Sequence, residues 1–212
     1  DDPGLMMEEQ GLVFWVQGVR WEYQERAYLM LHKPAGFECS QKPGAYPSVY
    51  TLLPGPLRQR GGGAAAGVQA VGRLDQDTTG LLLLSDDGKF IHRMTSPRHH
   101  VPKVYQVQVK HPLDARQIER LLAGVVLDDD PRPVRAADCR SLGTYQLELT
   151  LTEGKYHQVK RMVAAVGNRV EGLHRCSIGA VSLVPELAQG AWRWLTAAER
   201  ELLMASGKPT AA

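Results

Sequence analysis

The sequence has few cysteines and no long apolar run, and these absences exclude several classes of protein. The three cysteines, Cys39, Cys139 and Cys176, are widely separated and form no CxxC pair. Their spacing argues against a zinc site or a disulfide framework and favours a reducing cytoplasm. Apolar runs such as Leu81 to Leu84 are far too short to span a bilayer. No secretory signal pattern is present at the start, so we expect a cytoplasmic protein without a membrane span.

The chain also has little net charge. Its 25 Lys and Arg residues nearly balance its 23 Asp and Glu residues, which leaves +2. Total charge therefore does not indicate a nucleic-acid-binding protein. Basic residues are nevertheless concentrated between residues 98 and 111 and again between residues 155 and 175. Solvated faces of ordinary elements would explain such runs about equally well, so charge alone leaves RNA binding open.

The 212 residues and an ordinary apolar fraction are sufficient for one large domain or two small ones. Strands are predicted from apolar runs and alternation at residues 28–31, 81–84, 105–109 and 145–151. Helices are predicted from apolar spacing around residues 90–94, 118–122 and 159–166, and from a capping box at residues 196–199. The low-complexity stretch 55–68 is predicted to be a flexible loop or insertion. Without strict β-α-β alternation, the pattern predicts an α+β fold with a mixed, mostly antiparallel sheet flanked by helices and loops.

The densest chemical signal is the segment GRLDQDTTG at residues 72–80. It is rich in glycine and polar residues and leads directly into the predicted buried strand LLLL. Loops that rigid strands hold in place often carry catalytic side chains. A turn in which Asp75 or Asp77 accepts hydrogen bonds from nearby backbone amides explains the same pattern. Spacing alone leaves both interpretations open, with the turn slightly ahead.

The segment GRLDQDTTGLLLLSDDG resembles the catalytic motif of the RsuA/RluB/RluE/RluF group of pseudouridine synthases. The resemblance extends from about residue 28 to residue 203 and continues, in the family's order, through YLMLHKPAGF, SPRHHVPKVYQV and EGKYHQVKRMVAAVGNRVEGLHR. Within the group, SPRHH and KYHQVKRM are most similar to RsuA-type enzymes, which modify 16S ribosomal RNA. Members that act on 23S RNA tend to carry an Asn-Arg pair where this chain has Tyr156 and His157. The resemblance implies the pseudouridine synthase fold and isomerisation of uridine in 16S RNA.

The resemblance also assigns roles to individual residues. It implies that Asp75 is the nucleophile and that Arg73 supports the flipped-out nucleotide. Tyr105 matches the tyrosine that stacks on the target base. Lys160 falls where the family keeps a basic partner for the aspartate, and Leu173 matches an apolar residue beneath the pocket. Without the resemblance, Tyr105 would be interpreted as a core tyrosine, whereas a solvated helix face and a functional role would explain Lys160 about equally well.

Several other basic residues are predicted to bind RNA, and their phosphate contacts should make binding fall steeply with salt. They are Lys33, Arg98, Lys103, His157 and Arg161. The histidines also invite a metal-site interpretation. They have no acidic or cysteine partners at ligand spacing, so we predict no metal site.

The chemistry that the resemblance implies requires no cofactor. Conversion of uridine to pseudouridine breaks the N1–C1′ bond, rotates the uracil and rejoins it through C5, without redox change or group transfer. An aspartate acts as a nucleophile only when it is ionised. Because the target atoms are inaccessible in a stacked helix, the base must be flipped out. Addition of Asp75 to uracil C6 and its attack at C1′ both stay open.

The predicted organisation is a catalytic domain over residues 28–205 and a C-terminal tail over residues 206–212. Residues 1–27 are interpreted as an N-terminal segment, either a remnant of or a linker to a missing S4-type RNA-binding domain. We expect a monomer that acts on 16S RNA within a small-subunit assembly intermediate. The alternatives are the same chemistry on 23S RNA, a non-catalytic RNA-binding or ribosome assembly factor, and, least favoured, a metal-dependent hydrolase.

Overall fold

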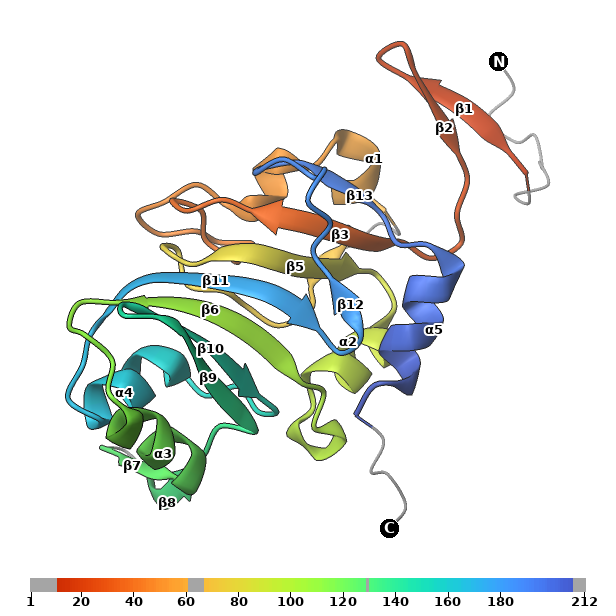
Figure 1. Cartoon of the computed structure of the whole chain (residues 1–212). Helices are drawn as coiled ribbons and strands as arrows, with labels where there is room; N and C mark the ends of the chain where they lie inside the picture. Colours follow the sequence, from red (N-terminus) through yellow and green to blue (C-terminus); the bar gives the residue numbers. More distant parts are fainter. Residues whose placement is uncertain (1–10, 61–66, 129, 208–212) are drawn as a thin grey trace.

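One extended sheet runs through the protein, and the elements that carry the site are attached to it (Figure 1). The computed structural model describes residues 11–60, 67–128 and 130–207. Within these ranges, nine strands form the sheet: β3 (Tyr28–Lys33), β4 (Gln69–Ala70), β5 (Thr79–Ser85), β6 (Lys103–Val109), β9 (Asp138–Gly143), β10 (Gln146–Leu151), β11 (Val170–Ile178), β12 (Val181–Ser182) and β13 (Trp192–Trp194).

The strand order confirms the predicted sheet type. Seven strands follow one another as β13-β3-β5-β11-β6-β10-β9, while β12 pairs with β11 and β4 pairs with β5. The β5–β11 pair is parallel, and the other pairs of this sheet are antiparallel. The sheet is therefore mixed and mostly antiparallel.

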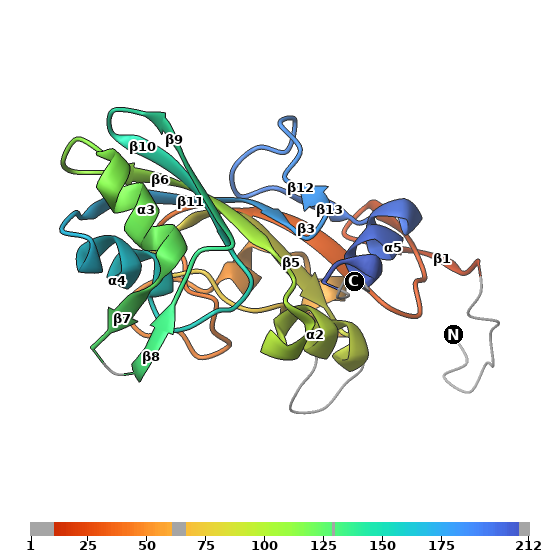
Figure 2. The same cartoon turned by 60° about the horizontal axis from the view of Figure 1, so that its bottom comes forward.

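The helices are α1 (Gly55–Arg58), α2 (Gly88–Thr95), α3 (Ala115–Ala123), α4 (Gln158–Ala165) and α5 (Ala197–Ala205), with 3₁₀ turns at Val49–Leu52 and Pro97–His99. The four longer helices lie toward the two ends of the sheet (Figure 2). α3 and α4 lie beside β6, β9 and β10, whereas α2 and α5 lie at the other end. The four longer helices are those that the sequence predicts. The capping box of α5 is confirmed, since the Thr196 hydroxyl accepts a hydrogen bond from the Glu199 amide at 3.1 Å.

β5 is buried on both faces, and this explains its continuous run of leucines. Leu81 and Leu83 pack in one hydrophobic cluster, which also contains Phe90 of α2. Leu82 and Leu84 pack in a second cluster on the opposite face. Because successive side chains of a strand point to opposite faces, a strand that is covered on both sides needs apolar residues at every position.

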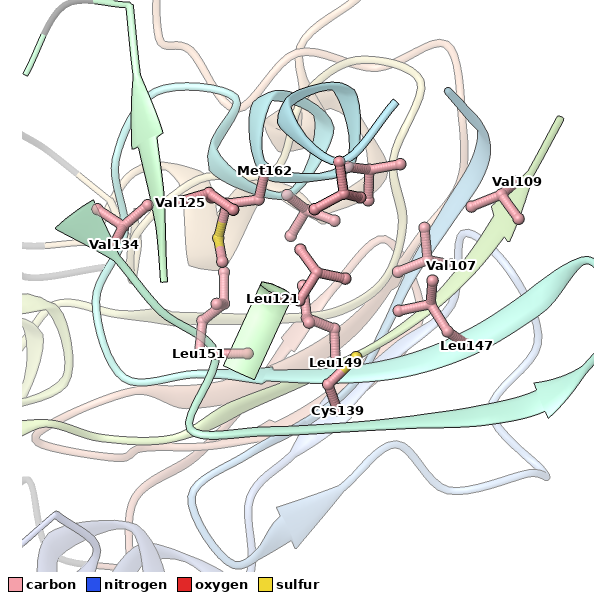
Figure 3. Packing of buried hydrophobic residues seen from close by; sticks show 14 of the residues in the cluster. Val107, Val109, Leu121, Val125, Val134, Cys139, Leu147, Leu149, Leu151 and Met162 are labelled. Atoms are coloured by element: carbon pink, nitrogen blue, oxygen red, sulfur yellow. The ribbon is translucent and has the colours of Figure 1, made fainter. Parts of the chain in front are cut away.

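A third cluster occupies the other half of the sheet, beyond β11 (Figure 3). Val107 of β6 and Leu147 and Leu149 of β10 face Leu121 of α3 and Met162 of α4. Apolar residues spaced three and four apart put one stripe of each helix against the sheet. This packing fixes α4, whose polar side bears Lys160, beside β7 (Val125–Leu127) and β11.

Two hairpins and a short helix were not predicted from the sequence. β1 (Val13–Val16) pairs with β2 (Val19–Glu22), and β7 (Val125–Leu127) pairs with β8 (Asp130–Val134). α1 lies within the stretch predicted as a loop, where Pro56 stands in the first turn, a position that suits proline. Residues 61–66 of that stretch lie outside the described residues. Of the predicted tail, only Ser206 and Gly207 are described.

Within the part of the chain that the structure describes, no helix has the length and apolar character needed to cross a membrane.

Candidate active site

The segment between β4 and β5 forms a tight loop that carries the predicted nucleophile. The Thr78 amide donates to the Asp75 carbonyl at 3.1 Å, which closes a turn. The Gly36 amide, in the turn after β3, donates to the Gln76 carbonyl at 2.8 Å. Leu74 is buried in the cluster beneath. With Leu74 anchored and Thr78 leading into β5, the Asp75 side chain stands on a rigid support.

Lys33 fastens this loop from below and differs from its predicted role. The residue is fully buried, and its Nζ donates to the carbonyls of Pro34 (3.0 Å), Gln76 (3.2 Å) and Thr78 (2.8 Å). Burial lowers the pKa of Lys33 below its usual value. Nearby groups that include Asp77 and Asp75 raise this pKa, but burial outweighs them. An ammonium enclosed by three carbonyls does not reach a phosphate, so Lys33 supports the loop instead of contacting RNA.

The carboxylate of Asp75 meets two basic side chains from α4 and its N-terminus. Oδ2 lies 3.1 Å from Lys160 Nζ, and Oδ1 lies 3.3 Å from His157 Nε2. The Asp75 side chain keeps 28% of its surface exposed. The carboxylate is thus held by side chains from a distant element rather than by amides of its own turn, and it stays open to a ligand.

Lys160 also binds a second carboxylate. Its Nζ donates to both oxygens of Asp77, at 2.7 and 2.9 Å. For Asp77, desolvation raises the pKa, but the Lys160 hydrogen bond and charge outweigh it and the pKa falls below its usual value. For Lys160, desolvation lowers the pKa, yet the two carboxylates raise it on balance. Lys160 therefore stays protonated in the neutral range and carries one positive charge between two acids.

His157 stands at the N-terminal cap of α4 in an unusual backbone conformation. Its φ is +47°, in the left-handed region, and its ring stacks on Tyr156 with centroids 3.8 Å apart. Residues three apart on a helix share a face. His157 and Lys160 consequently approach Asp75 from the same side.

The remaining wall of the site comes from β6 and β11. Tyr105 lies directly opposite Arg175 in the antiparallel pair, and Leu173 lies two residues before Arg175 on the same face. Arg175 is buried, its Nε donates to the Leu81 carbonyl at 2.8 Å, and its Nη2 has no hydrogen-bond partner among the described residues. Arg175 packs against Gly80 of β5, where a Cβ would meet the Arg175 carbonyl oxygen at 2.3 Å.

Together these elements enclose a cleft of about 860 Å³, a volume typical of a ligand site. Predicted site residues that line it are Arg73, Asp75, Lys103, Tyr105, His157, Lys160 and Leu173. Arg98 is exposed on the turn after α2, and Arg161 donates to the Tyr156 carbonyl at 3.2 Å; neither is a lining residue. The cleft therefore brings together side chains from four separate segments of the chain.

Lys103 gives the cleft a titratable cation near neutral pH. Burial and the repulsion of Arg175 lower the pKa of Lys103 to about 8. Its Nζ donates to the Val101 carbonyl at 3.0 Å. Arg73, by contrast, is exposed at the rim of the cleft. Both cations are placed to attract a polyanion.

The described residues contain no group of three or more His, Cys, Asp and Glu side chains arranged to bind a metal ion. At the cleft, Asp75 pairs instead with His157 and Lys160, and Asp77 pairs with Lys160.

Sequence reasoning missed one contact at the cleft, that of His157 with Asp75, and one lining residue, Arg175. The contact between His157 and Asp75 could have been anticipated from the spacing of His157 and Lys160 on one helix. Arg175 could have been anticipated from strand alternation with Leu173, because both then face the same side. No sequence signal separates the buried Lys33 from a surface lysine.

Comparisons with known proteins show which proteins the chain resembles. The sequence pattern of the RNA pseudouridylate synthase family matches residues 27–165. The chain is 45% identical over 172 residues to the ribosomal small subunit pseudouridine synthase A of Pasteurella multocida, covering 81% of this chain and 71% of that protein. It is 42% identical over 196 residues to the Haemophilus influenzae protein of the same name, covering 92% and 78%.

The fold is likewise similar to known structures. A crystal structure of a pseudouridylate synthase superimposes with a TM-score of 0.77 at 37% identity, covering 95% of this chain and 84% of that one. An H/ACA ribonucleoprotein bound to a substrate RNA that contains 2′-deoxyuridine shares the fold, with a TM-score of 0.55 at 14% identity.

Proposed function

Because the chain belongs to the RNA pseudouridylate synthase family, it is an enzyme that isomerises uridine in RNA, and we propose that its target is 16S RNA of the small ribosomal subunit, with Asp75 as the nucleophile. The observation that carries the assignment of Asp75 is its position. One carboxylate, part exposed, stands in the cleft between Lys160 and His157. A nucleophile needs access to its target, and the part-exposed carboxylate of Asp75 in the cleft has that access.

The reaction is a rearrangement within one nucleotide. The N1–C1′ bond breaks, the uracil turns, and a C5–C1′ bond forms; N1 takes up a proton and C5 loses one. Asp75 attacks either uracil C6 or C1′, and both routes require its carboxylate beside the glycosidic bond. Lys160, shared between Asp75 and Asp77, keeps its own positive charge beside the nucleophile.

Other residues of the cleft prepare the substrate. The target uridine must leave its stack before the bond is accessible. Tyr105 faces the flipped base with its ring, Leu173 packs below it, and Arg73 at the rim fills or braces the vacated position. The unpaired Nη2 of Arg175 offers a hydrogen bond to a carbonyl oxygen of the bound nucleotide. The reaction requires no cofactor in this scheme.

The choice of RNA rests on the relatives. Proteins at 42–45% identity are named ribosomal small subunit pseudouridine synthases. Their name supports an RNA of the small subunit as substrate, and the pair Tyr156 and His157 supports 16S over 23S RNA. We propose that the protein acts as a monomer in the cytoplasm, on a partly assembled small-subunit particle.

The first prediction tests this function directly. Purified protein is incubated with 16S transcript, 23S transcript and partial small-subunit particles, and pseudouridine is mapped by carbodiimide-dependent primer-extension stops. Wild-type protein should produce a stop in 16S RNA, and Asp75→Asn should abolish it, since the amide is not a nucleophile. Asp77→Asn is the matched control: it removes the other carboxylate at Lys160 and should slow modification less than about tenfold.

Each alternative has its own outcome. A stop in 23S RNA alone would move the substrate to the large subunit while keeping the chemistry. Identical maps for wild type and Asp75→Asn would refute the assignment of the nucleophile and favour a non-catalytic RNA-binding or assembly factor.

A further inference from the structure

A second cavity lies at the far end of β3 from the catalytic loop. It is open to solvent and has a volume of about 470 Å³, and its lining comes from β2, the segment that follows β2, the start of β3, β13 and α5. Figure 1 shows the hairpin rising from the sheet on the side of β13 and α5. Tyr28, in the wall of this cavity, precedes Lys33 by five residues on β3. At about 3.4 Å per residue, roughly 17 Å separates the cavity from the catalytic loop.

Aromatic rings form much of its wall. Trp21 and Trp192 lie with ring centroids 6.2 Å apart and an interplanar angle of 15°, and Trp194 meets Trp192 edge to face. All three are only partly buried. Three of the four tryptophans of the chain therefore converge on one cavity. A folded core does not need this arrangement, because large apolar side chains are ordinarily covered.

The wall is also cationic. Arg20, Arg26 and Arg200 line the cavity together with one acid, Glu22. The Arg200 guanidinium lies 5.0 Å from the centre of the Tyr28 ring, and its buried Nε has no hydrogen-bond partner among the described residues. A buried donor without an acceptor destabilises the folded protein, and a ligand that supplies an acceptor would remove this cost.

Partly exposed aromatic rings with arginines beside them suit a nucleotide as ligand. Every nucleobase presents a π-face that stacks on an aromatic side chain, and every nucleotide carries a phosphate that pairs with a guanidinium. An acidic peptide would satisfy the arginines and leave the three indole faces unused.

We propose that this cavity is a second RNA-binding site, which takes an unstacked nucleotide of the substrate strand by base stacking on Trp21 and Trp192 and phosphate contact with Arg20 and Arg200. The inference rests on the proposed RNA-modifying function. At about 3.4 Å per stacked nucleotide, the bound nucleotide lies roughly five steps from the target uridine. The site holds the strand while the uridine enters the catalytic cleft.

Tryptophan fluorescence reports on this cavity selectively, because no tryptophan lines the catalytic cleft. The probe is an oligoadenylate of about eight nucleotides, which contains no uridine and cannot be a substrate. Trp15 is 66% exposed and lies in the same hairpin outside the cavity lining. In a Trp15→Leu protein, every remaining tryptophan lines the cavity. Oligoadenylate should quench this fluorescence to saturation.

Two variants test the contacts. Trp21→Leu should raise the dissociation constant for oligoadenylate about tenfold relative to Trp15→Leu, measured by fluorescence anisotropy of labelled RNA. Arg20→Gln alters an exposed side chain and should reduce the slope of log affinity against log salt by about 0.7, as expected for one lost phosphate contact. Thermal unfolding of each variant confirms that it is folded.

The same proteins separate this inference from the proposed function. Asp75→Asn should keep full quenching by oligoadenylate while losing pseudouridine formation, and Trp21→Leu should raise KM for 16S RNA with little change in kcat. Absence of quenching in Trp15→Leu, or equal RNA affinity for Trp21→Leu and Trp15→Leu, would overturn the second site and leave the catalytic assignment standing. Quenching without any modification of 16S or 23S RNA would overturn the catalytic assignment and leave the second site standing.

Discussion

At the scale of single residues, the site depends on one cation that serves two carboxylates. Lys160 binds Asp75 at 3.1 Å and Asp77 at 2.7 Å. Lys160 therefore divides its ion-pair contacts between the two carboxylates. One ammonium group thus faces two carboxylates, so the ammonium does not balance the combined negative charge of Asp75 and Asp77. His157 then orients the other oxygen of Asp75.

The contact of His157 with Asp75 leads to a prediction on turnover. His157→Asn removes the imidazole, whereas asparagine tolerates the left-handed backbone at φ +47° better than most residues do. Because Asp75 then has one orienting partner fewer, kcat for pseudouridine formation should fall about tenfold, with KM changed less than twofold. Single-turnover and steady-state rates on 16S RNA measure both quantities.

A matched control exists elsewhere in the chain. His100 has nearly the same backbone conformation, with φ +48°, and is not a lining residue of the cleft. His100→Asn should leave both constants unchanged. Equal rates for His157→Asn and His100→Asn would show that His157 is only a helix cap.

Lys103 leads to a prediction on pH. Burial and Arg175 lower its pKa to about 8, so Lys103 carries its charge at pH 7 and loses most of it by pH 9. An RNA contact made by the ammonium therefore weakens as pH rises through about 8. The dissociation constant for 16S RNA should rise about threefold between pH 7 and pH 9. Lys103→Arg stays charged throughout and should show a flat profile, as should the weaker-binding Lys103→Gln. Titration of the RNA itself is common to all three proteins, and a Lys103→Gln profile parallel to wild type would contradict the assignment.

Sequence reasoning reaches some of these residues and not others, for physical reasons. The pairing of Lys160 with Asp75 was predicted through the resemblance, and the structure brings the two side chains together. Lys33 was predicted to contact phosphates but is buried, because the turn after β3 folds three carbonyls around its ammonium. Side-chain burial depends on the tertiary path of loops, which composition does not encode.

At the scale of elements, one glycine, Gly80, lets β5 pair in parallel with β11. Gly80 has φ +111°, and an added Cβ would lie 2.3 Å from the carbonyl oxygen and 2.6 Å from the amide nitrogen of Arg175. Gly80→Ala should therefore lower the free energy of unfolding by at least about 2 kcal/mol, measured by denaturant unfolding. Gly88→Ala, at the start of α2 with open space around it, should change it by less than about 0.5 kcal/mol. Similar stabilities for the two variants would show that the backbone yields at Gly80.

Local patterns predict elements better than they predict partners. The stripe of α4 and the alternation of β10 are visible in the sequence because one side of each faces the core. The hairpin β1–β2 was missed, since Trp21 of β2 lines a cavity together with β13, which is far away in the sequence. The parallel pairing of β5 with β11 could not be predicted from local patterns either. The sequence of a strand buried on both faces is a continuous apolar run, which does not indicate the strands that pair with it.

At the scale of the whole molecule, the sheet joins two regions with different tasks. The half around β6, β10 and α4 carries the cleft wall and a hydrophobic cluster without tryptophan. The half around β3 and β13 carries the aromatic cavity. β5 and β11 lie between them and hold the catalytic loop and Arg175. A strand of RNA that contacts both halves would thus be positioned by one rigid body.

Because the sheet is continuous, we predict that its two halves unfold together, so that a destabilising substitution in one half shifts the unfolding midpoint measured in the other. Leu121 of α3 is fully buried in the cluster of Figure 3, and Leu121→Ala should cost about 2–5 kcal/mol. Trp192 and Trp194 lie at the opposite edge of the sheet, in β13. If the sheet unfolds as one unit, Leu121→Ala lowers the unfolding midpoint seen by tryptophan fluorescence as much as that seen by far-ultraviolet circular dichroism. Leu122→Ala, a neighbour that is 39% exposed, should shift both midpoints by little. A fluorescence midpoint that stays at the wild-type value while the dichroism midpoint falls would mean that the halves unfold separately, and the spacing between the two RNA sites would then not be fixed.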